Sequence, residues 1–182
     1  MTKVLSVAMY ALILSAGSAF ASPVFEAELD PYLGAIQDDW TAFGCDEGWG
    51  EWSCVDDNEG TEDYLKTNDI NIGERFYMEN LPSSAESVDY VKVRFYAERY
   101  DWIKNRFTVF LWNTSEDYYQ ISIIEATSIP EWHEVVLHYN PMTHDPWTVS
   151  DVNNLQLGMN SRTGWFSGAK VYSMDMIVGY RT

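Results

Sequence analysis

Residues 86–100 read ESVDYVKVRFYAERY, and their alternation decides the fold class. Val91, Val93, Phe95 and Ala97 fall on one face of an extended chain, opposite charged and tyrosine side chains. The stretch therefore predicts a β-strand with one buried face and one face in water.

Runs of the same period follow at 105–113, 118–126, 131–139 and 169–180, each ending in turn-forming residues. Shorter β candidates precede them at 25–29, 50–55, 63–67 and 74–80, and 155–159 adds another, which makes nine or ten strands. The one helical signal lies near 147–154, where Thr148 can cap and Asp151 has the capping-box spacing.

Many short strands with almost no helix predict an all-β fold: a two-sheet antiparallel β-sandwich of the jelly-roll type. An immunoglobulin-like sandwich is disfavoured because its Cys…Trp…Cys spacing is absent and the strand count is higher. We expect Ile121 and Ile123 to point inward, and Tyr172 to share a face with Met174. The predicted core contains Val91, Val93, Phe95, Phe107, Val109, Leu111, Leu155 and Leu157.

Residues 1–21 have the pattern of a secretory signal peptide: Lys3, a short apolar run, and small residues at Ala19 and Ala21. An uncleaved anchor is the alternative. We expect one domain over 22–182, secreted or extracellular, with the periplasm or cell surface as options. No membrane span is expected in the mature chain, because no later stretch has about 20 apolar residues.

The 182-residue chain carries 28 acidic and 11 basic side chains, a formal net charge of −17, which argues against nucleic acid as a partner. Between Ser22 and Asp63 there are 13 acidic residues and no Lys or Arg. Such a density of one charge sign is self-repelling unless a cation is present.

The most acidic loop, 55–66, has hard oxygen ligands of the kind that calcium prefers. Its glycine and glutamate positions do not match an EF-hand, and a solvated acidic loop is the alternative. The candidate calcium ligands in this loop are Asp56, Asp57, Glu59, Glu62 and Asp63.

Cys45 and Cys54 are close in sequence within a chain that we expect to be exported, so a local disulfide is expected, with two free thiols as the alternative. Four tryptophans lie outside the regular strand pattern. They could stack on sugar rings or fill a partner's pocket, although packing is the commoner use of such residues. These candidate ligand-binding residues are Trp49, Trp52, Trp102 and Trp165.

Catalysis is poorly supported, and no enzyme is expected. His133, His138 and His144 fall in no motif, and the sequence has no nucleophile elbow, zinc-binding pair or phosphate loop. The triplet Asn113-Thr114-Ser115 matches an N-glycosylation acceptor.

The segments around Asn140-Pro141, 147–158 and 171–180 resemble small jelly-roll structural proteins of tailed phages and their bacterial relatives. They also resemble the jelly-roll carbohydrate-binding modules of secreted enzymes. The second resemblance implies that Glu26 in the first strand and Asp175 in the last help to hold a structural calcium.

Export, a single domain and these resemblances favour a non-catalytic secreted protein that acts in extracellular surface interaction or self-assembly as a structural subunit, stabilised by calcium. The alternative is a carbohydrate-binding module with an extracellular polysaccharide as partner. A polysaccharide hydrolase or lyase is the third interpretation.

Overall fold

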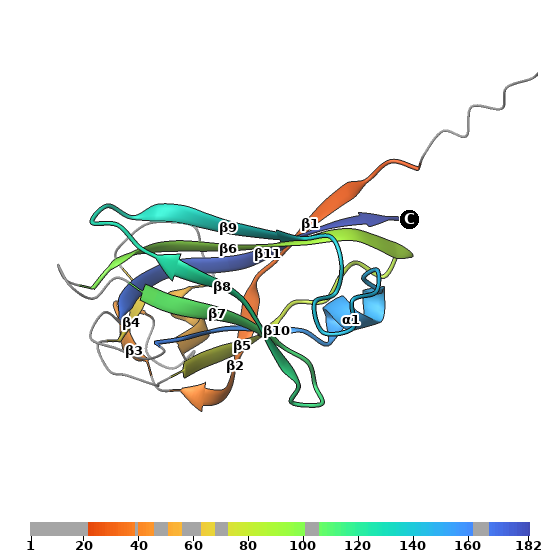
Figure 1. Cartoon of the computed structure of the whole chain (residues 1–182). Coiled ribbons are helices and arrows are strands. Elements are labelled where there is room, and N and C mark those ends of the chain that lie inside the picture. The colour runs from red at the N-terminus through yellow and green to blue at the C-terminus, as the bar shows by residue number, and fades with distance from the viewer. Residues whose placement is uncertain are drawn as a thin grey trace, which may run out of the picture.

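The computed structural model describes residues 22–38, 40–45, 51–55, 63–67, 73–100, 106–161 and 168–182, which form two stacked β-sheets (Figure 1). A 3₁₀ helix, η1 (Glu51–Cys54), and a short α-helix, α1 (Val149–Asn153), accompany the strands. The strands are β1 (Phe25–Leu29), β2 (Pro31–Asp38), β3 (Thr41–Phe43), β4 (Tyr64–Thr67), β5 (Gly73–Met78), β6 (Ser87–Arg99), β7 (Arg106–Trp112), β8 (Tyr118–Glu125), β9 (Glu131–Leu137), β10 (Gln156–Asn160) and β11 (Ala169–Arg181).

The strand order confirms the predicted jelly roll. With β1–β3 set aside, the strand order is β4-β11-β6-β9 in one sheet and β5-β10-β7-β8 in the other. An antiparallel hairpin wrapped around a barrel-like core produces this pair of orders. The first three strands extend these sheets: β1 pairs with β11, β2 with β5, and β3 with β4. The molecule is thus an all-β, two-sheet antiparallel sandwich.

The core lies between the two sheets, where the predicted alternation places it. All eight predicted core residues are at most 3% exposed, and the Phe95 and Phe107 rings meet edge to face at 5.6 Å. Valine, leucine and phenylalanine suit this position because they fit a pleated surface and bury large apolar areas.

The capping signal predicted a short helix, and the structure has one, α1. It lies at one end of the sandwich (Figure 1). The Asp151 backbone N–H donates to the Thr148 hydroxyl at 3.0 Å, and the Thr148 backbone N–H donates to the Asp151 carboxylate at 2.9 Å. Trp147 anchors the preceding loop by donating from its indole nitrogen to the Leu137 carbonyl at 2.9 Å.

The structure confirms the Cys45–Cys54 disulfide, which brings the two Cα atoms to 5.1 Å. The same bridge explains one wrong prediction. The described part of the predicted strand at 50–55 is not extended: Glu51–Cys54 forms the 3₁₀ helix η1. A disulfide between residues nine positions apart requires the chain to turn.

Two side chains point to the other face from the one predicted, because β-bulges interrupt the alternation. The pairing of β7 with β8 shifts between Val109 and Phe110, and Ile123 is 56% exposed whereas Ile124 is 6% exposed. The pairing of β11 with β6 shifts between Val171 and Ser173. Tyr172 therefore leaves the Met174 face and packs on the outer surface.

The predicted signal peptide, residues 1–21, lies outside the described residues. Within the described part of the chain, no helix combines the length and the apolar character needed to cross a bilayer.

Candidate functional site

The outer face of the five-stranded sheet is built by residues that alternate with the core. On β10, Leu157 and Met159 are buried inside the sandwich, so Gln156, Gly158 and Asn160 point away from it. The pairing places Gly158 between Arg75 of β5 and Phe110 of β7 and places Trp112 beside Gln156. We call this surface the β5–β10–β7 face, defined by Arg75, Phe110, Trp112, Tyr118, Gln156, Gly158 and Asn160.

Three aromatic rings cluster on the β5–β10–β7 face. The ring of Phe110 lies 5.2 Å from that of Trp112 and 5.8 Å from that of Tyr118, and the Trp112 and Tyr118 rings are 6.1 Å apart. Phe110 is buried, Trp112 is half-buried, and Tyr118 is 57% exposed. The cluster thus offers ring surface to solvent from a packed base.

Gly158 lets the Trp112 ring approach the backbone of β10 closely. A Cβ atom at this position would come within 2.8 Å of the Trp112 ring and within 2.4 Å of the Glu74 carbonyl oxygen. Any larger residue would therefore push the ring away from β10.

Arg75 connects the aromatic cluster to a carboxylate. Its guanidinium carbon lies 5.4 Å from the Trp112 ring centre, and Nη1 donates to Glu116 Oε2 at 3.0 Å. Glu116 reaches this position from the β7–β8 turn with a left-handed φ of 66°. Such a conformation is unfavourable for a residue with a side chain, and strain of this kind clusters at functional sites.

Three polar atoms on the same face are buried and have no hydrogen-bond partner among the described residues: Arg75 Nε, Gln156 Oε1 and Asn160 Oδ1. Buried polar groups are nearly always paired, and an unpaired one costs about 1–3 kcal/mol. The three side chains come from the adjacent strands β5 and β10. The β5–β10–β7 face therefore carries one unused donor and two unused acceptors, of which the Gln156 acceptor belongs to the residue paired with Trp112.

The outer face of the six-stranded sheet has a different character. A row of rings crosses it with centroid separations of 5.3–5.9 Å: Phe43, Tyr64, Tyr172, Tyr96 and Trp132. Cations lie over three of these rings, with Lys66 over Phe43, Lys170 over Tyr64 and Arg94 over Trp132. Among the described residues, this row lacks the buried, unpaired polar atoms that the β5–β10–β7 face has, so we assign it to cross-strand stabilisation of the sheet.

Asp175 and Glu26, the residues implied as calcium ligands, lie on this second face. Asp175 is fully buried, and its two oxygens accept from Arg94 Nε and Nη2, each at 2.7 Å. Arg94 Nη2 also donates to Glu28 at 2.6 Å. Glu26 accepts a hydrogen bond from the Tyr90 hydroxyl, which raises the pKa of Tyr90 to about 12.

Burial raises the pKa of Asp175, and the Arg94 guanidinium opposes that shift. In the described residues, no three His, Cys, Asp or Glu side chains are grouped as a metal site requires. Asp63 is described and precedes β4, whereas Asp56, Asp57, Glu59 and Glu62 lie outside the described residues. The calcium site therefore stays a prediction.

The structure does not test the four tryptophans predicted to bind a ligand. Trp49, Trp102 and Trp165 lie outside the described residues, and Trp52 belongs to η1 without a described side chain. Sequence reasoning missed the β5–β10–β7 face. The signal that could have found it is the alternation in 105–113 and 155–159, because the residues between the core positions point to the opposite face.

No family model matches the chain, and no curated protein matches it in sequence. Solved structures with a similar architecture include a xylan-binding module of family 15, with a TM-score of 0.44, 7% identity, and coverage of 88% of this chain and 97% of that one. A family 29 carbohydrate-binding module has a TM-score of 0.40 and 6% identity, with 86% of both chains covered.

Two similar structures belong to longer chains. The chain of the Clostridium thermocellum xylanase 10B, which carries a family 22 module, has a TM-score of 0.46 and 11% identity over 87% of this chain and 29% of that one. Tailspike protein 4 of bacteriophage CBA120 has a TM-score of 0.41 and 8% identity, covering 84% of this chain and 19% of that one. Likenesses at this level leave the functional argument to the residues of this chain.

Proposed function

We propose that this protein binds a neutral polysaccharide through its β5–β10–β7 face. The observation that carries the proposal is the placement of partly exposed aromatic rings beside unpaired, buried polar atoms on one sheet surface. This is the alternative that the sequence left open beside the structural-subunit interpretation.

The chemistry of the face suits a sugar chain. A pyranose ring has an apolar C–H surface that packs on a flat aromatic ring, and its hydroxyls both donate and accept hydrogen bonds at the ring edge. Tyr118 and Trp112 supply the stacking surface. Arg75 Nε and Gln156 Oε1 are buried, so they can donate to and accept from sugar hydroxyls once these side chains turn outward on binding.

Neutral glycans are favoured over acidic ones. The chain has a formal net charge of −17, so an anionic polymer is repelled at long range. On the face itself, the positive charge of Arg75 is already paired with Glu116 at 3.0 Å.

Affinity electrophoresis tests the proposal directly. The purified protein runs through native gels that contain soluble xylan, glucomannan or hydroxyethylcellulose, with alginate as the acidic comparison. We expect retardation by at least one neutral polymer. Tyr118→Ala should weaken that binding at least about tenfold, or about 1.4 kcal/mol, because stacking surface is lost. Trp112→Ala should weaken it as well.

Trp132→Ala, on the opposite sheet, is the matched control and should bind as the parent does. Each variant's melting temperature is measured first, so that unfolding is not mistaken for lost binding. Absence of retardation by every neutral polymer would refute the proposal, as would equal losses in the Tyr118 and Trp132 variants.

The interpretation as a secreted, self-assembling subunit remains a separate prediction. Sedimentation velocity over a hundredfold concentration range distinguishes the two, since a subunit forms larger species at high concentration. We propose that binding occurs without cleavage, and reducing ends counted after incubation with the bound polymer test that point.

A further inference from the structure

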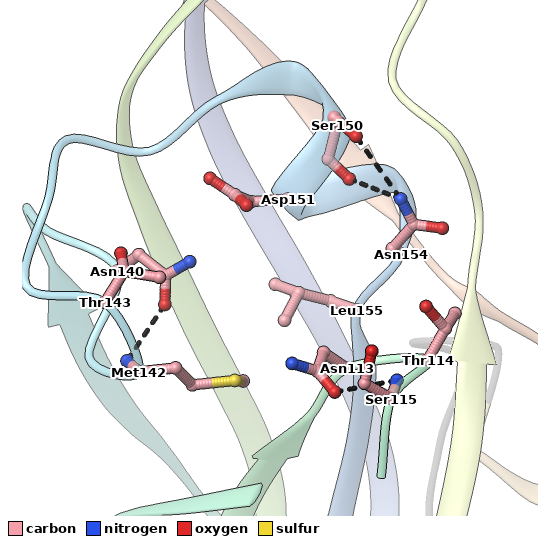
Figure 2. Close-up of a pocket in the computed structure, with 10 residues that line it drawn as sticks. All are labelled: Asn113, Thr114, Ser115, Asn140, Met142, Thr143, Ser150, Asp151, Asn154 and Leu155. Atoms are coloured by element: carbon pink, nitrogen blue, oxygen red, sulfur yellow. Dashed lines mark hydrogen bonds between the residues drawn. The ribbon is translucent and has the colours of Figure 1, made fainter. Parts of the chain in front are cut away.

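A second feature of the molecule is a cavity of about 190 Å³ at the α1 end of the sandwich. It lies between the β7–β8 turn, the connection from β9 to α1, and the start of β10 (Figure 2). The residues that line it are Asn113, Thr114, Ser115, Asn140, Met142, Thr143, Ser150, Asp151, Asn154 and Leu155.

The lining combines amides and hydroxyls with a small apolar part. Leu155 and Met142 supply the apolar surface, and Asp151 is the charged residue among those that line the cavity. Pockets for drug-sized ligands occupy about 300–1,000 Å³, so a cavity of 190 Å³ suits a molecule with one ring. Such a ligand needs many hydroxyls and no net negative charge.

Asn140 is the most informative residue of the cavity. It is 4% exposed, and its Oδ1 accepts from the Met142 backbone N–H at 2.9 Å. Figure 2 shows its amide nitrogen turned toward Asp151, on the far side of the cavity. Within the described residues that nitrogen has no hydrogen-bond acceptor. A buried amide thus presents an unused donor to the cavity.

The surrounding loops hold this donor in place. The Asn140 backbone N–H donates to the Asp145 carbonyl at 2.9 Å, and the His144 N–H donates to the Asn140 carbonyl at 2.8 Å. On the opposite wall, Asn113 Oδ1 accepts from the backbone N–H groups of Ser115 and Asp117 at 2.9 and 3.1 Å. These bonds fix which end of the Asn113 amide accepts. One N–H of its nitrogen donates to Asp117 Oδ2 at 3.3 Å, and the second N–H remains for a ligand.

We propose that this cavity binds a single neutral sugar ring. The Asn140 and Asn113 amide nitrogens donate to sugar hydroxyls, the Asp151 carboxylate accepts from one, and Leu155 and Met142 contact the ring's C–H surface. Because the loops are held by hydrogen bonds before a ligand arrives, little ordering entropy is lost on binding. This site does not rest on the function proposed for the β5–β10–β7 face.

The test follows the side-chain amide signals of Asn113 and Asn140 by NMR in ¹⁵N-labelled protein. The probes are D-glucose, D-galactose, D-mannose and D-xylose, with D-glucuronate as the charged comparison. We expect at least one neutral sugar to shift both signals saturably, and glucuronate to bind at least tenfold more weakly, because Asp151 repels it.

Two variants address the cavity by different routes. Thr114→Tyr fills its mouth from an exposed turn position. Asn140→Asp keeps an oxygen for the Met142 N–H but removes the amide donor. Each should weaken the sugar's affinity at least tenfold. Ser128→Tyr, an equivalent exposed substitution in the β8–β9 connection, should change it less than twofold.

The proposal is overturned if no neutral sugar shifts the two amide signals, if glucuronate binds as tightly, or if Thr114→Tyr binds as the parent does. Tyr118→Ala separates the two sites. The cavity proposal requires unchanged sugar affinity in that variant, and a loss would place the sugar on the sheet face instead.

Discussion

Asp175 illustrates how a single buried carboxylate finds its counter-charge. Resemblance implied a calcium ion, and the structure places the Arg94 guanidinium against both carboxylate oxygens at 2.7 Å. A planar guanidinium matches a carboxylate in this two-bond geometry, and Glu28 adds a second negative group to the same cation. A buried charge pair with its hydrogen bonds made is costly to break from one side.

His133 lies on β9 directly opposite Phe95 and is half-buried, with its Nε2 unpaired. Burial lowers its pKa below the usual 6.5, while the charge of Glu131 acts in the opposite direction. The folded state therefore disfavours the protonated imidazole, so stability is intact above pH 6.5 and falls as the pH drops below it.

His133→Leu should remove this acid-dependent loss, which for one proton is at most about 1.4 kcal/mol per pH unit. Urea unfolding of parent and variant between pH 7.5 and 5 measures it. His138→Leu, at an exposed position, is the control. Parallel stability curves for the parent and His133→Leu would contradict the expectation.

At the scale of elements, α1 shows how a five-residue helix forms at all. So short a helix is not stable by propensity alone. Here the reciprocal Thr148–Asp151 hydrogen bonds satisfy its first N–H groups, and Val152 is buried against the core. The cap can be read from sequence because it depends on residues three positions apart.

Thr148→Ala should lower the free energy of unfolding by about 0.5–2 kcal/mol, because the Asp151 N–H loses its acceptor. Denaturant titration at neutral pH measures the change. Ser128→Ala, in an exposed connection, should alter stability by less than about 0.5 kcal/mol. A Thr148 variant as stable as that control would show that tertiary packing alone holds the helix.

Across the whole molecule, the acidic first third of the chain has to fold despite its charge. Between Ser22 and Asp63 it has 13 carboxylates and no Lys or Arg. The structure shows that part of the relief comes from distant basic residues, since Arg94 of β6 binds Glu28 of β1. The rest of the acidic loop, 56–62, lies outside the described residues.

We propose that calcium supplies the remaining positive charge. A cation that binds only the folded state raises stability by mass action. Millimolar calcium chloride should therefore raise the melting temperature more than sodium chloride at the same ionic strength. Asp57→Ala combined with Asp63→Ala should shrink that difference. Equal shifts from both salts would show that the carboxylates are only screened.

The alternation in 86–100 and its repeats predicted the fold class and the core, because a period of two states which side chains share a face. Phe95 and Leu111 were assigned inward on that basis, and both are completely buried. The disulfide and the capped helix were predictable for a different reason: each joins residues that are close in sequence.

The β5–β10–β7 face and the α1 cavity were decided by tertiary structure. Arg75 meets Trp112 and Glu116 only because β5, β10 and β7 pair in that order, and Asn113 and Asn140, which line the same cavity, are 27 positions apart in the sequence. The bulges that redirect Ile123 and Tyr172 likewise depend on a partner strand. Local sequence specifies periodicity, whereas strand order and register follow from which apolar faces are buried together.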